Sequence, residues 1–160
     1  MNQSQYKFGV IKVGSEVVTK PETGYLDEKS IERIVTQVAT IRSSIDRLCI
    51  VTSGAVAAGR AKVNGLLDVD REDETPEDKQ VYSAAGQPIL HSMYEKYLSK
   101  FGLHAIQILL TKGDYERKEF RSLFQRALTH PNIIPVVNEN DAVTDSQIRY
   151  GDNDRLAKDI

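Results

Sequence analysis

The sequence has little of what marks a secreted, membrane-spanning or polyanion-binding protein. Its 160 residues include a single cysteine, Cys49, so no internal disulfide can form, and a reducing cytoplasm is the expected compartment. No apolar run approaches the ~18 residues that suggest a membrane span, and the first residues lack the layout of a signal peptide. With 21 basic against 23 acidic side chains, the net charge of −2 gives no reason to expect a nucleic acid as partner. These absences exclude classes of protein without indicating any chemistry.

What the sequence does contain is an alternation of short apolar runs with longer segments of helical spacing. The apolar runs have strand length and are mostly continuous, as in strands that are covered on both faces; they are residues 8–13, 48–51, 104–110 and 133–137. Helical spacing predicts helices within residues 27–42, 76–100 and 116–128, a short helix of small residues at 55–60, and the first turns of another at 155–160. The alternation predicts an α/β fold, a doubly wound and mainly parallel sheet with helices on both faces.

Two further segments are given no role in chemistry. Residues 68–79 include seven acidic side chains out of twelve, which favours a solvated surface loop over a metal site. Residues 83–88 combine small side chains with a proline, and we expect them to allow a close approach between a helix and the sheet. Cys49 is expected to pack in the core. The three histidines are expected to be structural, because their spacing fits no metal site.

The turns that follow the first two strands are candidate ligand contacts. Gly14 and Ser15 follow the first strand, and Ser53 and Gly54 follow the second. Glycine lets backbone N–H groups approach a ligand closely, and a helix N-terminus favours negative charge. Two such turns at one sheet edge would form a cradle for a phosphate or a carboxylate. Tight turns also need glycine for conformational reasons alone, so both interpretations stay open.

Lys12 and two polar clusters indicate a ligand site more specifically than the glycine turns do. Lys12 interrupts an apolar strand, where a charge is costly unless it faces a cleft or a partner; the alternative is a lysine that extends to solvent from an edge strand. Amide and carboxylate side chains gather at residues 138–141 and 151–154. Such groups suit recognition of an amino group, although they also form turns and helix caps. The sequence lacks the phosphate-loop motif of P-loop kinases.

A series of ordered motifs resembles the amino acid kinase family, in particular its glutamate-phosphorylating members. The motifs are KVGS at 12–15, IVTSGAVAAG at 50–59, AAGQP at 84–88, QILLT at 107–111, IPVVNENDAV at 134–143 and GDND at 151–154. The resemblance implies that Lys12 and Asp154 are catalytic, with the lysine stabilising the transferring phosphoryl group and the aspartate orienting catalytic lysines. It implies that Gly14 and Ser15, with Lys12, contact ATP. The residues implied to bind the amino acid substrate are Ser53, Gly54, Asp141, Asp152 and Asn153.

The implied reaction transfers the γ-phosphoryl group of ATP, with Mg²⁺, to the side-chain carboxylate of L-glutamate. The product is L-glutamyl 5-phosphate, and the reaction opens proline biosynthesis. Because a carboxylate is already ionised at neutral pH, no general base is required, and transfer depends on positioning and charge stabilisation. The resemblance also implies a cytoplasmic homo-oligomer, proline as a feedback inhibitor, and no nucleic acid or membrane as partner.

The family's kinase domain continues well past residue 154. We therefore expect residues 1–160 to form the N-terminal, amino-acid-binding portion of a single domain. The nucleotide-binding portion, with a second catalytic lysine, is expected to lie outside this sequence, so these 160 residues alone should be nearly inactive. Two alternatives stay open: a non-catalytic module for binding glutamate or proline or for oligomerisation, and a kinase with another acceptor such as N-acetylglutamate.

Overall fold

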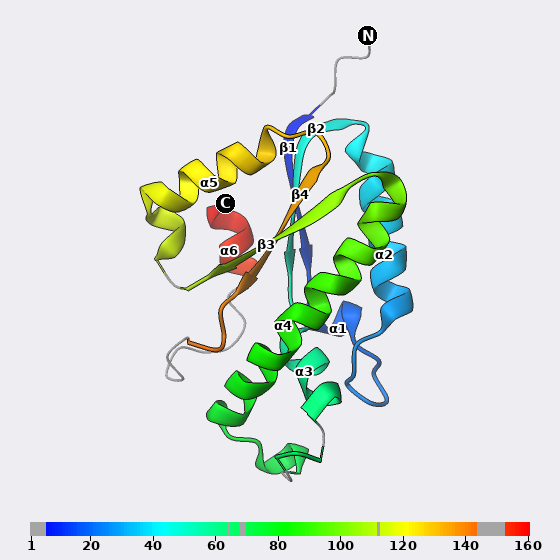
Figure 1. The fold of residues 1–160 in the computed structure, drawn as a ribbon, viewed down its shortest axis with the longest axis vertical. Helices are drawn as coiled ribbons and strands as arrows, with labels where there is room; N and C mark the ends of the chain where they lie inside the picture. Colours follow the sequence, from blue (N-terminus) through cyan, green and yellow to red (C-terminus); the bar gives the residue numbers. More distant parts are fainter. Residues whose placement is uncertain (1–5, 64, 68–69, 112, 144–152) are drawn as a thin grey trace.

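The computed structural model describes residues 6–63, 65–67, 70–111, 113–143 and 153–160, and its centre is a parallel sheet (Figure 1). The four strands lie in the order β1-β2-β4-β3, and every neighbouring pair is parallel. Their bounds are Tyr6–Val13 for β1, Ile45–Thr52 for β2, His104–Leu110 for β3 and Ile133–Glu139 for β4. In Figure 1 β1 and β2 run downward, and β4 and β3 slope increasingly toward the lower left. The predicted parallel α/β fold is confirmed, and β1 is an edge strand of this sheet.

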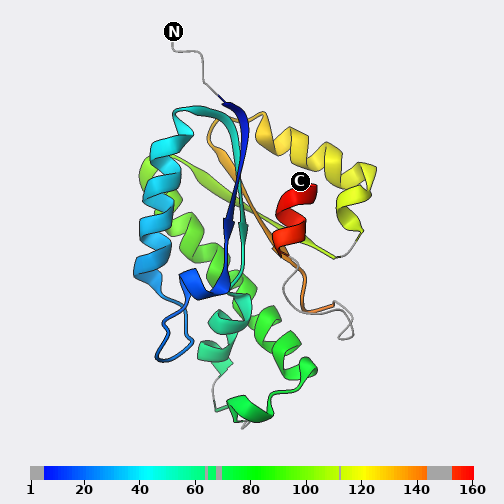
Figure 2. The ribbon, with the colours of Figure 1, turned by 180° about the vertical axis from the view of Figure 1, so that it is seen from behind.

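Helices cover both faces of the sheet, as Figures 1 and 2 show from opposite sides. Leu48 and Ile50 of β2 belong to one apolar cluster, whereas Cys49 and Val51 belong to the other, and all four are fully buried. Because successive side chains of a strand point to opposite faces, a continuous apolar run requires cover on both. The first face packs against α2 (Glu28–Arg42) and α4 (Pro76–Leu98), and the second against α5 (Lys118–Leu128) and α6 (Asn153–Asp159).

Cys49 packs in the core, as the sequence predicts. It is fully buried in the second apolar cluster. Burial raises the pKa of its thiol to about 12, because the thiolate would lose its hydration there. None of the helices in the described ranges is long and apolar enough to cross a lipid bilayer. The described residues also include no group of three or more His, Cys, Asp or Glu side chains that could hold a metal ion.

The acidic segment 68–79 is more ordered than predicted in the part that the structure describes. Thr75 caps α4 and forms a capping box with Asp78. The side chain of Glu74 is 3% exposed and accepts two hydrogen bonds from Arg60, at 2.5 and 2.6 Å. Net acidity predicts a solvated loop. This is wrong for Glu74, whose carboxylate is compensated by Arg60 of the preceding helix, and for Asp78, which the start of α4 uses, whereas residues 71–73 and 75–77 are exposed.

Two glycines bring α4, which also packs on the sheet, into close contact with α3 (Ala55–Val63). A Cβ atom added to Gly86 would overlap the carbonyl oxygen of Ala55, and one added to Gly59 would overlap that of Tyr82. The small side chains of residues 83–88 thus serve a helix–helix contact that the sequence does not predict, whereas the predicted approach to the sheet is made at Gln87, which is hydrogen-bonded to β3 and β4. The contact fixes the first turn of α3 directly after β2.

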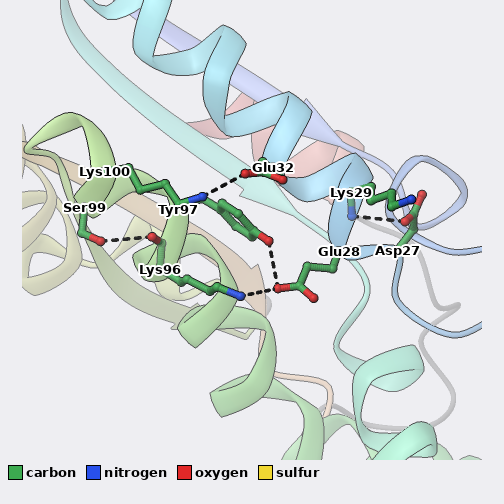
Figure 3. Close-up of polar contacts among 8 residues, drawn as sticks. All are labelled: Asp27, Glu28, Lys29, Glu32, Lys96, Tyr97, Ser99 and Lys100. Carbon is green, nitrogen blue, oxygen red and sulfur yellow. Dashed lines mark hydrogen bonds and ion pairs between the residues drawn. The ribbon is translucent and has the colours of Figure 1, made fainter.

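Polar contacts join α4 to α2 on the outer surface (Figure 3). Glu28 at the start of α2 accepts hydrogen bonds from Lys96 Nζ at 2.6 Å and from Tyr97 OH at 2.8 Å. Lys100 Nζ lies 2.9 Å from Glu32 Oε1. Asp27 caps α2, accepting from the backbone N–H of Lys29 at 3.2 Å. The two ion pairs are exposed, so they add orientation more than stability, whereas Tyr97 is buried.

Candidate functional site

A cavity of about 440 Å³ lies beyond the carboxyl ends of β2 and β4. Its wall is assembled from the turns after three strands and from the starts of two helices, which bring together segments far apart in the sequence. Ligands of doubly wound sheets bind at this edge, because the strand-to-helix turns leave backbone groups and short polar side chains there. The predicted residues among those that line it are Ser15, Ser53, Gly54, Asp141 and Asn153.

Asn153, the first residue of α6, holds the ends of two strands together. Its Nδ2, which has two hydrogens, lies within hydrogen-bond distance of three acceptors, namely the carbonyl oxygen of Thr52 at 3.0 Å, Ser53 Oγ at 2.9 Å and Asn138 Oδ1 at 3.1 Å. The residue is 8% exposed. Its Oδ1 is buried and has no hydrogen-bond partner among the residues that the structure describes. A buried acceptor of this kind is costly unless a ligand donates to it.

Asp141 follows β4 and is partly buried at the cavity wall. Ser83 Oγ of α4 donates to its Oδ2 at 3.2 Å. Burial raises the pKa of the Asp141 carboxyl, and the hydrogen bond from Ser83 opposes that effect only in part. Within the described ranges no Lys, Arg or His lies within ion-pair distance of Asp141. A carboxylate in such surroundings is suited to a cationic ligand group.

Amide side chains fix the end of β4 from which Asp141 projects. Gln87 Nε2 of α4 donates to the carbonyl oxygen of Glu139 at 3.1 Å, and Asn138 Nδ2 donates to Gln87 Oε1 at 3.4 Å. Gln107 Nε2 of β3 donates to the carbonyl oxygen of Gln87 at 3.3 Å. Both glutamines belong to motifs quoted from the sequence, and in the structure they position the cavity wall.

Gly54 is required by the turn between β2 and α3. Its φ is +110°, a conformation that other residues rarely adopt. An added Cβ would also lie 3.0 Å from Val18 Cγ2 and 3.1 Å from Leu26 Cδ2. The conformational interpretation of this glycine is therefore sufficient by itself. The turn nevertheless places the first turn of α3, which begins at Ala55, in the cavity wall.

Lys12 and Asp154 form an ion pair beside the cavity rather than in its wall. Lys12 Nζ lies 2.8 Å from Asp154 Oδ1, and the two side chains are 34% and 70% exposed. The hydrogen bond from Lys12 lowers the pKa of the Asp154 carboxyl. Asp154 directly follows Asn153, which lines the cavity, so the ion pair lies next to the cavity wall. Their catalytic roles stay predictions.

Three predicted residues are placed less directly. Ser15 lines the cavity, at the start of α1 (Ser15–Val18). Gly14 precedes α1 with an extended backbone, at φ −72° and ψ 159°, and is not among the residues that line the cavity. Asp152 lies outside the described residues. The predicted nucleotide contacts of Gly14 and Ser15, and the substrate contact of Asp152, stay predictions.

Sequence reasoning missed several residues that hold or line the cavity. Ser83 is 58 residues from Asp141 in the chain, and nothing in its local sequence indicates that contact. Thr52 Oγ1 lies 2.8 Å from Tyr94 OH, a fully buried hydroxyl at the base of the turn. Arg60 and Arg71 also line the cavity. The charge balance of the whole chain hides these arginines, because Arg71 lies within the acidic segment 68–79 and Arg60 pairs with Glu74 of the same segment.

Fold and site together define a doubly wound α/β domain with a polar small-molecule site at the ends of its strands. The model of the amino acid kinase family matches residues 7–160. The chain therefore belongs to the amino acid kinase family, as the motifs predict.

Over the aligned residues, curated relatives are identical to this chain at more than a third of the positions. A glutamate 5-kinase from Carboxydothermus hydrogenoformans is 39% identical over 151 residues, which cover 92% of this chain and 40% of that one. A glutamate 5-kinase from Caulobacter vibrioides is 41% identical over 152 residues, covering 92% and 39%. For a glutamate 5-kinase from Clostridium acetobutylicum the identity is 39%, and the coverage is 92% and 55%. The chain thus spans about two-fifths to about half of these relatives' length.

Solved structures agree on the fold. An isopentenyl phosphate kinase matches with a TM-score of 0.51 at 20% identity, over 82% of this chain and 56% of that one. The product complex of an isopentenyl phosphate kinase from T. acidophilum matches with a TM-score of 0.53 at 18% identity, over 82% and 54%. At this identity the likeness concerns the arrangement of strands and helices.

Proposed function

We propose that this chain is the amino-acid-binding part of an ATP-dependent glutamate 5-kinase, which phosphorylates the side-chain carboxylate of L-glutamate. The observation that carries the proposal is the cavity in which Asp141, Ser53 and Asn153 meet at the ends of β2 and β4. Membership of the amino acid kinase family and the similarity to glutamate 5-kinases over 92% of the chain support it.

The α-ammonium group of the amino acid fits the acceptors of the cavity. Asp141 offers a carboxylate without a cationic partner among the described residues, and Asn153 offers its unused Oδ1. An ammonium group has three donors and a positive charge, so it can satisfy both acceptors at once. N-acetylation would remove that charge and two of the donors. The cavity thus favours a free amino acid over an acylated one.

The phosphoryl transfer would take place on the side of Lys12. The substrate carboxylate attacks the γ-phosphorus, and the bond to the β-γ bridging oxygen of ATP breaks, which leaves ADP. Lys12 would stabilise charge on the transferring group, and Asp154 holds Lys12 in place through the 2.8 Å ion pair. Mg²⁺ bound to the phosphates would supply further positive charge there. We assign no metal ligand to the described residues, which contain no group of three suitable side chains.

The activity is tested on the protein that the complete reading frame encodes. Incubation with ATP, Mg²⁺ and L-glutamate should release ADP and yield a glutamyl phosphate that hydroxylamine traps as the hydroxamate. Lys12→Met should lower kcat about 100-fold or more, the usual cost of removing one group that stabilises transition-state charge. Lys7→Met removes the same charge from the opposite, exposed end of β1 and should leave kcat unchanged. Hydroxamate formation from N-acetyl-L-glutamate but not from L-glutamate would overturn the proposal.

The proposal also assigns the reaction to the start of proline biosynthesis in the cytoplasm. It includes inhibition by L-proline and assembly into a homo-oligomer, which a proline titration of the same assay and a light-scattering mass would test. Residues 1–160 alone should form almost no hydroxamate. Robust activity of that purified segment would contradict the assignment of the nucleotide site to a further part of the domain.

A further inference from the structure

Arg71 brings a positive charge to the cavity from the connection between α3 and α4. It begins the short 3-10 turn η1 (Arg71–Asp73), and its side chain lies against the backbone of Gly24. A Cβ atom added to Gly24 would lie 2.6 Å from both Nη1 and Nη2 of Arg71. Nη1 also donates a long hydrogen bond of 3.5 Å to the carbonyl oxygen of Thr23. The bare backbone of Gly24 therefore forms a seat for the guanidinium group.

The two arginines of the cavity differ in what occupies their donors. Arg60 uses Nε and Nη2 in a two-pronged ion pair with Glu74, and its guanidinium lies 5.4 Å from the centre of the Tyr82 ring. Its charge is thus compensated within the fold. Arg71 lies within ion-pair distance of no carboxylate in the described part of the chain. Of its five N–H donors, only one on Nη1 has a hydrogen-bond partner among the described residues, so the others can serve a ligand.

The charges of an amino acid require two different partners in the cavity. Asp141 offers a partner for the ammonium group, but the α-carboxylate next to that group also loses hydration when it enters. A buried carboxylate needs a cation or several donors to offset that loss. Figures 1 and 2 both show η1 below α3, whereas α6, which carries the partner of Lys12, lies above it. A substrate with two carboxylates can therefore direct one toward Arg71 of η1 and the other toward Lys12 beside α6.

We propose, on the basis of the function proposed above, that Arg71 binds the α-carboxylate of the substrate and selects amino acids in which this group is free. The planar guanidinium presents paired N–H donors that match the two oxygens of a carboxylate. The bare backbone of Gly24 and the carbonyl oxygen of Thr23 place the exposed guanidinium at the cavity before the ligand arrives, which reduces the entropy lost on binding. Arg71 is then a specificity-determining residue, separate from Lys12 and from Asp141.

The test compares two ligands by calorimetric titration of the protein encoded by the complete reading frame. One is L-glutamate, and the other is its α-amide, which keeps the ammonium group and the side-chain carboxylate but lacks the α-carboxylate charge. Arg71→Ala should weaken L-glutamate binding about 10- to 100-fold, the effect expected for a charge-assisted pair of hydrogen bonds. It should change the Kd of the α-amide less than about 3-fold, which is well below the change expected from the loss of one charge-assisted hydrogen bond. Arg71→Lys keeps the charge but loses the paired N–H donors, so its Kd for L-glutamate should lie between those of the unsubstituted protein and Arg71→Ala.

Lys62→Ala is the matched control, because it removes one positive charge from the exposed side of α3 near the same connection. It should leave both dissociation constants unchanged. Melting curves of all variants separate binding from folding, since equal weakening of both ligands with a lowered Tm would show a structural role and overturn the inference. An unchanged Kd for L-glutamate in Arg71→Ala overturns the inference alone. Failure of the unsubstituted protein to bind L-glutamate overturns the proposed function as well.

Discussion

Asp141→Asn separates the binding role of this residue from its effect on stability. The amide has almost the same size as the carboxyl, and its oxygen can accept the hydrogen bond that Ser83 Oγ donates at 3.2 Å. The substitution removes the negative charge that is proposed to meet the substrate's ammonium group. Hydrogen bonds to charged groups contribute about 1.5–3 kcal/mol. The Kd for L-glutamate should therefore rise about 10- to 150-fold.

Stability should change in the opposite direction. Burial raises the pKa of Asp141 above its ordinary value of 3.8, so ionisation of this carboxyl costs folding free energy. The cost is absent below the ordinary value and complete once the pH exceeds the raised value. Asp141→Asn avoids that cost, so at neutral pH its Tm should equal or exceed that of the unsubstituted protein. A gain of about 1 kcal/mol would appear as about 2–4 °C for a domain of this size.

Calorimetric titration with L-glutamate and thermal unfolding at pH 4 and pH 7 check both halves of this prediction. The stabilising effect of the substitution should be smaller at pH 4 than at pH 7, because less of the unsubstituted carboxyl is ionised there. A Tm that falls by 5 °C or more, about 1–2 kcal/mol, together with weakened binding, would show that Asp141 supports the fold instead. Unchanged binding of L-glutamate would refute the assignment of the ammonium group to this residue.

Three further predictions concern packing and the surface. Gly86→Ala should lower the free energy of unfolding by about 1–3 kcal/mol, because its Cβ would overlap the carbonyl oxygen of Ala55; an unchanged urea midpoint would contradict the close contact of α3 and α4. Cys49, buried with a thiol pKa of about 12, should resist iodoacetamide in the native protein and react after unfolding, as mass spectrometry would show. Glu28→Gln should lower Tm slightly in dilute buffer and hardly at all in high salt, since its bond to Lys96 is exposed. A large, salt-independent loss would show that this contact is screened from solvent.

Much of the fold was predictable because its signals are local. The apolar run 48–51 predicts a strand covered on both faces, and the structure places its side chains alternately in two clusters. Asp27 directly precedes a helical pattern and caps α2. The burial of Glu74 in the acidic segment could not be predicted, because its partner Arg60 lies outside that segment, in α3. The small residues around Gly86 predict a close approach, but their spacing does not say which element approaches.

The part of the candidate site that lies in the turns at the strand ends was predictable from the sequence. Parallel strands end at one edge of a sheet, so the turns at Ser53 and Asp141 had to lie near each other once the fold was right. The hydrogen bonds that hold the wall could not be predicted, since Ser83 and Gln87 reach it from α4. The position of Arg71 at the cavity could not be predicted, because its side chain lies against Gly24, which is far away in the sequence.

A crystal structure of the complete protein with L-glutamate tests the central claim most directly. The account predicts that the ligand lies at the ends of β2 and β4, with its ammonium nitrogen within hydrogen-bond distance of the Asp141 carboxylate and of Asn153 Oδ1. Its side-chain carboxylate should point toward Lys12. L-Glutamate bound elsewhere, or bound there with its ammonium group directed away from Asp141, would contradict it.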